Sequence, residues 1–370
     1  MNWKFVIAIP GVELPRRVEA GSTAALPPDD PDYDAIAKSE PGVSEFLSRF
    51  STAFGRQLRP TIIAREKTAD LITAEDLSAF RNTIALAAIV EARRQRDRTQ
   101  WSSGPFFSEV FDFSPVAPRD AQFVDIQSPF SRGIHDIEEF AGQPSPIVPY
   151  PKNMRCEFDE GLLEALLRLW ASKATRRLVR RRTLLRSVEM ACHALRAPYS
   201  NLESLQDWGI TTSLWVSAFE IIACPDSGDV KFPHVSSMIK RVPWASRSLR
   251  KPAVRAIDRP GLTTRPVQVY GRLYRVRNSF LHGDRLPAGS IEPHRHPTWG
   301  HLSIQVPLLF RSVLLLNCQN LNLWHFPTEV PWVRMMSKGP QQKAAIKAAH
   351  AFRTQMDYEK ALGATEGDFF

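Results

Sequence analysis

Hydrophobic residues recur every three or four positions through most of the chain beyond residue 160, and this is the spacing of amphipathic helices. The pattern predicts long helices over 160–195, 208–223, 266–282 and 302–323. A shorter, charged helix is predicted over 341–361. Four long helices with one extended insert are typical of an antiparallel bundle.

The first 150 residues have a less regular pattern. Alternating apolar positions predict a strand within 1–15, and a loop rich in proline and aspartate is predicted over 20–35. Apolar residues on one face predict a helix over 73–96, which Thr73 would cap. The aromatic and proline-rich stretch 101–153 predicts short strands without a steady period.

Four prolines between 144 and 151 mark the predicted linker between two domains. We therefore expect a mainly α protein. The expected parts are a smaller, irregular α+β domain of unknown role over 1–150, an antiparallel helical bundle over 155–325, and a C-terminal extension with a short helix over 326–370.

Composition places the chain among soluble globular proteins, since 43% of its 370 residues are hydrophobic and 24% are charged. The apolar start is too short for a signal peptide. The longest apolar stretch, 306–316, is interrupted by Pro307 and Arg311, so no membrane span is expected. Four cysteines without paired spacing indicate reduced thiols, and these features together predict a cytoplasmic protein.

The net charge of +9 is concentrated in two clusters, and such clusters attract phosphate backbones through counterion release. The alternative is a solvated face without a partner. The first basic cluster consists of Arg176, Arg177, Arg180, Arg181, Arg182 and Arg186. The second basic cluster consists of Lys240, Arg241, Arg247, Arg250, Lys251 and Arg255. We expect the first five arginines to contact nucleic acid.

Three side chains suited to phosphoryl transfer lie at the end of the predicted helix 266–282: Arg277, Asn278 and His282. A histidine can move a proton, an arginine can stabilise charge on phosphate oxygens, and an asparagine can orient either group. At 3.6 residues per turn, Tyr274, Asn278 and His282 share one face of the helix. This arrangement predicts a site for phosphoryl chemistry.

Gly283 follows the motif and is the residue expected just beyond a helix end. An arginine and a histidine at similar spacing also occur at Arg186 and His193, without the asparagine and the glycine. The alternative interpretation of Arg277 and His282 is therefore a solvated helix end.

Arg277, Asn278 and His282 resemble the signature of the HEPN superfamily, which is Arg, a polar residue, three variable residues and His near a helix end. The apolar helix at 217–222, followed by Asp226, Ser227 and Gly228, resembles the first core helix and insert of the ApeA-like branch. The resemblance covers roughly residues 155–325. It implies an antiparallel bundle.

The resemblance also implies a metal-independent endoribonuclease that acts as a homodimer through the motif helix. His282 would be the general base or acid, Arg277 would stabilise charge, and Asn278 would orient the phosphate or the imidazole. Tyr274 would support the site. Glu220 would fix the guanidinium of Arg277; its alternative role is an ion pair with another arginine. A further implication is a role in bacterial antiphage defence or abortive infection.

Two alternative functions are compatible with the same residues. The first is a catalytically inactive module that binds RNA, a nucleotide or a protein. The second is a toxin controlled by a separately encoded antitoxin. The chain has no phosphate-binding loop or hydrolase elbow, and no carboxylate or thiol completes a metal site around His294, His296 and His301. No cofactor and no metal are predicted.

Overall fold

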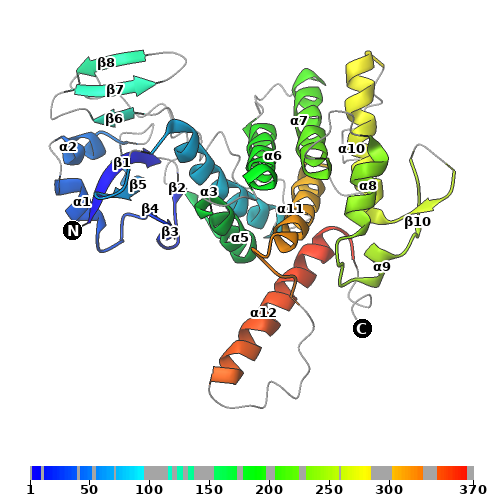
Figure 1. Ribbon diagram of the computed structural model, residues 1–370. Helices are drawn as coiled ribbons and strands as arrows, with labels where there is room; N and C mark the ends of the chain where they lie inside the picture. Colours follow the sequence, from blue (N-terminus) through cyan, green and yellow to red (C-terminus); the bar gives the residue numbers. More distant parts are fainter. Residues whose placement is uncertain are drawn as a thin grey trace. The chain divides into compact units, whose positions relative to one another are not determined.

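The computed structural model shows a mostly helical protein with small sheets near the N-terminus (Figure 1). It divides into two compact units with a boundary between Phe158 and Asp159. The predicted linker around residue 150 lies outside the described residues. The structure describes residues 2–9, 12–39, 42–51, 56–70, 72–95, 116–118, 123–127, 132–136, 154–172, 178–196, 205–224, 231–257, 260–284, 302–327 and 340–364.

The first unit is built on a four-stranded antiparallel sheet in the order β1-β5-β4-β3. Its strands are β1 (Trp3–Ile9), β3 (Val18–Ala20), β4 (Thr23–Leu26) and β5 (Thr61–Glu66). Two short helices contribute to the same core, α1 (Tyr33–Ser39) and α2 (Val43–Ser48). The rings of Phe5 on β1 and Phe46 on α2 meet edge to face with centroids 5.9 Å apart.

The predicted strand near the N-terminus is confirmed. The predicted loop over 20–35 is confirmed for the turns at 21–22 and 27–32 and is wrong where β4 and the start of α1 lie. The apolar run of β4 is buried along its whole length and pairs with β5. Residues 27–32 form turns, the first closed by a 3.0 Å hydrogen bond from Asp30 N–H to the Pro27 carbonyl. The prolines mark this turn, and long-range pairing decides the rest of the segment.

The remaining elements of this unit are small apart from one helix. The predicted helix over 73–96 is confirmed as α3 (Ala74–Gln95), whose first turn is capped by Thr73 Oγ1 accepting from Asp76 N–H at 3.1 Å. The last residues of this helix, Arg93 to Gln95, are grouped with the second unit. The short strands are β2 (Val12–Glu13), β6 (Val116–Pro118), β7 (Phe123–Gln127), β8 (Arg132–Asp136) and β9 (Met154–Arg155).

The second unit is helical, and the predicted helices over 208–223, 266–282, 302–323 and 341–361 are confirmed within a few residues. The run predicted over 160–195 is two helices in the structure. The elements are α5 (Glu160–Ala171), α6 (Leu178–Arg196), α7 (Leu205–Ala223), α8 (Phe232–Lys240), α9 (Arg247–Arg250), β10 (Val254–Arg255), β11 (Leu262–Thr263), α10 (Arg265–His282), α11 (Leu302–Asn320) and α12 (Pro340–Ala361).

Helix α11 forms the centre of this unit, because nearly all of its residues are buried. Among the described helices it is the one long and apolar enough to cross a membrane, but 78% of its most apolar window is buried inside the protein. Such burial is typical of the core helix of a soluble protein. Pro307 and Arg311 interrupt the apolar pattern without ending the helix.

Helix α12 packs into the same unit through a buried polar network. The carboxylate of Glu359 on α12 accepts hydrogen bonds from the backbone N–H groups of Ala245 and Ser246, at 2.8 Å and 2.6 Å. Gln355, one turn earlier, accepts from Arg311 on α11 at 2.9 Å. These contacts make the C-terminal extension an integral part of the helical unit.

Candidate functional site

Helix α10 carries the predicted motif, and both of its ends follow from local sequence. Pro266 occupies the first turn, where a missing N–H costs nothing. Gly283 ends the helix in the left-handed conformation, with a φ of 72°, which glycine adopts without strain. Asp284 N–H then donates to the Ser279 carbonyl at 2.9 Å. The predicted helix stop at Gly283 is confirmed.

The last turns of α10 rest on the N-terminal part of α7. A Cβ atom placed on Gly209 would lie 2.1 Å from the ring of Phe280, so that ring packs directly on the glycine backbone. Because no other residue leaves this space, Gly209 sets how closely the two helices approach. The position of the motif therefore depends on this contact.

Arg277 and Asn278 are joined in the structure. The Arg277 guanidinium donates to the Asn278 side-chain oxygen at 2.9 Å and lies 5.8 Å from the centre of the Tyr274 ring. Both arginine and asparagine are half-buried. The Asn278 carbonyl thus orients the guanidinium, while its amide nitrogen makes no hydrogen bond with any described residue.

Glu220 on α7 acts on this cluster from a distance. Burial raises the pKa of its carboxyl group, and the positive charge of Arg277 lowers it again in part. No ion pair joins these two described residues, because Arg277 donates to Asn278 instead. The expected proximity of Glu220 and Arg277 is therefore seen, and the expected direct contact is not.

Tyr270 completes the cluster beneath Tyr274. Its side chain is fully buried, and its hydroxyl has no hydrogen-bond partner. Burial raises its pKa, and the nearby charge of Glu220 adds to that effect. Its ring stacks on Phe232 at 5.5 Å. Tyr270 was not predicted as part of the site. Its position one turn before Tyr274 places it on the same face of the helix as Tyr274 and Asn278, and this spacing could have identified it.

His282 is the last residue of α10 and is exposed. The neighbouring Leu281 is 54% exposed although it is a large hydrophobic residue. Within one chain the imidazole makes no contact with Arg277 among the described residues. The site in a single chain therefore consists of Tyr274, Arg277 and Asn278 with a free histidine at the helix end.

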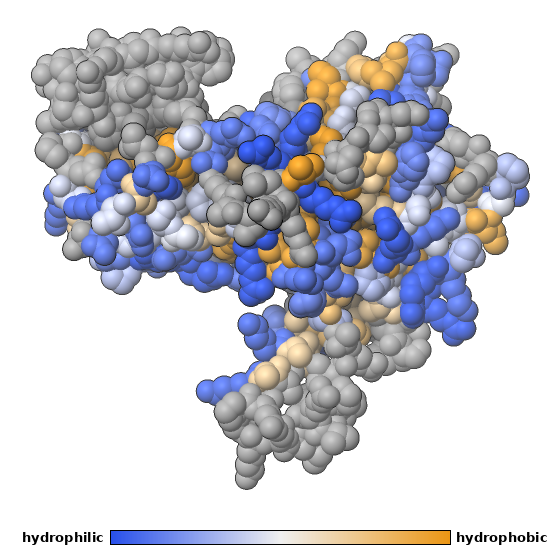
Figure 2. Space-filling view, in the orientation of Figure 1, coloured by the Kyte–Doolittle hydropathy of each residue, from blue (hydrophilic) through white to orange (hydrophobic). Residues whose placement is uncertain are grey.

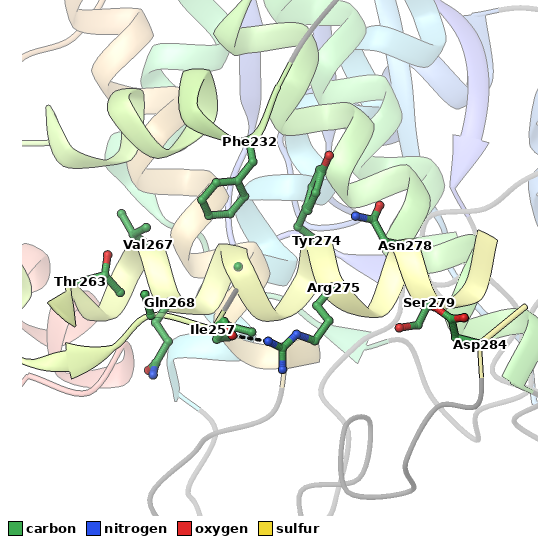
Figure 3. A pocket seen from close by; sticks show the side chains of 12 residues that line it. Phe232, Ile257, Thr263, Val267, Gln268, Tyr274, Arg275, Asn278, Ser279 and Asp284 are labelled. Carbon is green, nitrogen blue, oxygen red and sulfur yellow. Dashed lines mark hydrogen bonds between the residues drawn. The ribbon is translucent and has the colours of Figure 1, made fainter. Parts of the chain in front are cut away.

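A pocket of about 440 Å³ lies beside the motif on the face of α10 that carries Gly271 (Figure 3). Tyr274 and Asn278 project on one side of this face, and Arg275 and Ile257 lie on the other. The complete lining is Phe232, Ala256, Ile257, Thr263, Val267, Gln268, Gly271, Tyr274, Arg275, Asn278, Ser279 and Asp284. Asn278 therefore belongs to both the motif and the pocket.

The two basic clusters meet, although they are far apart in sequence. Arg180 of the first cluster and Arg241 of the second line one pocket of about 170 Å³ at the C-terminal end of α7. All six residues of the second cluster are exposed, as are Arg180 and Arg182. Arg181 instead donates to the Ser172 carbonyl. Arg176 and Arg177 lie outside the described residues.

This meeting point is not at the motif. Phe280 packs at Gly209, near the start of α7, whereas Ala223 at the Arg180–Arg241 pocket is 14 residues further along. A helix rises 1.5 Å per residue, so Gly209 and Ala223 are about 20 Å apart along α7. The Phe280 contact therefore lies near the start of α7, and the Arg180–Arg241 pocket lies at its C-terminal end.

The cysteines carry no chemistry at this site. Cys156, Cys192 and Cys318 are buried, and none of the four cysteines forms a disulfide. Burial raises the pKa of both Cys156 and Cys318 to about 12, so these thiols stay protonated. In the described part of the chain no three His, Cys, Asp or Glu side chains are grouped to hold a metal ion. His294, His296 and His301 lie outside that part.

Comparison with known proteins adds no family to this description. No protein-family model matches the chain, and no curated protein and no solved structure shows a significant match to it. The function must therefore be argued from the site itself.

Proposed function

We propose that the protein is an endoribonuclease of the HEPN type whose active site is the C-terminal end of α10. The observation that carries this proposal is the state of three side chains there. Arg277 is oriented by Asn278, His282 is exposed in the same two turns, and no described residue engages either Arg277 or His282 in an ion pair. These groups remain available to a phosphate.

The chemistry needs no metal. A substrate 2′-hydroxyl attacks its own adjacent phosphorus, so that a 2′-O–P bond forms as the bond between phosphorus and the 5′-oxygen breaks. One histidine removes the 2′-hydroxyl proton and a second protonates the departing 5′-oxygen. Arg277 stabilises the charge on the non-bridging oxygens. The products are a 2′,3′-cyclic phosphate and a 5′-hydroxyl, and DNA is not cut.

Two histidines are available when two copies associate through α10. The hydrophobic residues Leu281 and Ile210 are 54% and 49% exposed. Each is one residue from the Gly209–Phe280 contact, so both lie at the motif end of the α7–α10 pair. Figure 2 shows hydrophobic surface over these helix ends. Burial of this surface by a second copy brings the histidine of that copy to the motif of the first.

The basic end of α7 extends the RNA site. Exposed Arg180 and Arg241 line a pocket about 20 Å along α7 from the Gly209–Phe280 contact, a distance that a few nucleotides of single-stranded RNA span. These residues supply affinity without sequence selectivity, because phosphate contacts position a nucleic acid and do not read it. We assign the activity to the cytoplasm, in antiphage defence or abortive infection.

The test is cleavage of labelled total RNA and tRNA in the presence of EDTA. Wild type and His193→Ala should cut equally, because His193 is likewise an exposed histidine in the last turn of a helix. His282→Ala should not cut. Equal cutting by His282→Ala would remove this histidine from the mechanism.

Absence of cutting by the wild type favours the second candidate, an inactive module that binds RNA through the two basic clusters. That candidate predicts binding that is lost in Arg180→Ala/Arg241→Ala and unchanged in His282→Ala. The exposure of the whole second basic cluster is the observation that supports it.

A further inference from the structure

A glycine inside a helix lines the pocket beside the motif. Gly271 lies in the middle of α10, where glycine is less favourable than alanine. A Cβ atom there would meet Phe232 and Ile257 at 3.7 Å and 3.8 Å, which are ordinary contacts. Alanine is therefore sterically allowed, and close helix packing does not explain the glycine. Any longer side chain would enter the pocket.

The walls of the pocket suit a planar, apolar ligand with polar edges. Phe232 and Tyr274 meet edge to face at 5.5 Å on one side, and Ile257 lies opposite (Figure 3). Polar groups line both ends: Gln268 and Thr263 at one, and Asn278, Ser279 and Asp284 at the other. Pockets of a few hundred Å³ with mainly apolar walls are typical of small-molecule sites.

One buried polar group in the pocket lacks a partner. Thr263 on β11 is 5% exposed, and its hydroxyl oxygen has no hydrogen-bond partner. Leaving such a group unpaired is unfavourable unless a ligand completes it. At the other end, the Asn278 amide nitrogen also makes no hydrogen bond with a described residue. Free polar groups therefore face a ligand at both ends.

The surroundings of the pocket are cationic. Arg275 lines it and donates to the Ile257 carbonyl, which holds the guanidinium at the rim. Gln268 donates to the Arg255 carbonyl at 2.8 Å, so the second basic cluster begins at the far end of the pocket. A ligand with a flat heteroaromatic part and a phosphate matches this combination of walls and rim.

We propose that this pocket holds a nucleobase of the RNA strand, with the adjoining phosphate directed to Arg277 through their shared neighbour Asn278. The base contacts Tyr274 and Phe232 and bonds to Asn278, Ser279 or Asp284 with its edge. Cleavage then depends on the base next to the cut. The assignment of the base to an RNA strand rests on the proposed function. The binding of a nucleobase in this pocket does not.

The binding test uses the four ribonucleoside 3′-monophosphates, with ribose 5-phosphate as a probe that has no base. Calorimetry on the full chain should show at least one nucleotide binding tenfold or more tightly than ribose 5-phosphate. Gly271→Leu should abolish that difference, and Gly271→Ala should change it less than threefold. Thr263→Val keeps the shape of the side chain but removes its hydroxyl, and it should weaken nucleotide binding several-fold. This variant tests the proposal if Gly271→Leu does not fold.

Equal affinity for nucleotides and ribose 5-phosphate in the wild type overturns the proposal, as does unchanged binding by a folded Gly271→Leu.

A second arm identifies the source of the base. If the RNA strand supplies it, the tight-binding nucleotide inhibits cleavage competitively, and one abasic residue beside the cut lowers kcat/KM at least tenfold. Cleavage that ignores both changes overturns the assignment to RNA. Nucleotide binding in a protein that cuts no RNA supports the pocket while rejecting the proposed nuclease.

Discussion

Arg311 and Arg277 lie in the same helical unit and show two uses of an arginine. Arg311 is 2% exposed and is ion-paired with Asp159, hydrogen-bonded to Gln355 at 2.9 Å and placed 3.7 Å from the Tyr358 ring. Arg277 is half-buried and has one weak cation–π contact and one amide partner. The comparison separates a charge that joins helices from a charge that remains available to a ligand.

The difference follows from what surrounds each guanidinium. A buried charge is tolerated only when it is paired and hydrogen-bonded, and Arg311 meets that condition with partners from the start of α5 and from α12. Arg277 has only a neutral amide and the more distant charge of Glu220. A phosphate would give Arg277 the strong partner that it lacks.

The largest expected effect is on stability. Arg311→Ala leaves Asp159 as an unpaired buried charge, and loss of one partner of a buried pair costs about 3–5 kcal/mol. Urea unfolding followed by tryptophan fluorescence measures the change. Arg168→Ala is the matched control, because it breaks an exposed pair with Glu164 and one hydrogen bond to the Leu323 carbonyl, and it should cost less than about 2 kcal/mol. A similar cost for both variants would contradict a structural role for Arg311.

The next effect is on activity. Arg277→Ala should lower kcat for RNA cleavage by about 10²–10³-fold, the range for removal of one donor to a developing oxyanion. Its free energy of unfolding should change by less than about 1 kcal/mol, because its partner Asn278 is neutral and half-buried. Arg168→Ala, at an arginine on α5 outside the motif and both basic clusters, should retain full activity. Equal rates for the two variants would show that Arg277 is not catalytic.

A smaller effect is expected at the helix contact beneath the motif. In Gly209→Ala the new methyl group must displace the Phe280 ring, and overpacking of this kind costs about 1–3 kcal/mol. Cleavage should fall with it, because the last turn of α10 moves. Gly271→Ala is the control, since its methyl group would meet only ordinary contacts and should not destabilise the fold. Thermal unfolding and cleavage rates of the two variants test this difference.

The smallest effect concerns pH. Burial raises the pKa of Glu220 in the folded protein, so its charged form is disfavoured there relative to the unfolded chain. Above that pKa, Glu220→Gln should be slightly more stable than wild type. As pH falls through the folded pKa toward the unfolded value, the wild-type carboxyl is protonated and the advantage should disappear. A difference that stays constant between pH 7 and pH 4 would contradict this assignment.

Local signals predicted the parts of the site that local structure determines. The helix stop at Gly283, the shared face of Tyr274 and Asn278, and the adjacency of Arg277 all follow from helix geometry. The hairpin of β10 and β11 has only two residues in each strand, too few for an alternation of apolar and polar residues that would predict a strand. The Thr263 wall of the pocket was therefore not predicted.

Contacts between residues far apart in the chain could not be predicted from the sequence. Asp159 and Arg311 are 152 residues apart, and the local sequence around either residue does not identify the other as its partner. In the sequence Arg311 only interrupts an apolar run, because a buried, hydrogen-bonded arginine and an exposed one are the same letter. The same limit applies to Arg180 and Arg241, which are 61 residues apart and line one pocket at the end of α7.

The most direct test of the central claim uses one RNA in two forms. A labelled oligoribonucleotide that the wild type cuts is compared, in EDTA, with the same strand carrying a 2′-deoxynucleotide immediately 5′ of the cut. Cleavage by 2′-hydroxyl attack at Arg277 and His282 predicts a 2′,3′-cyclic phosphate end in the first strand and no cut at that position in the second. Cutting of both strands at the same position would contradict the account.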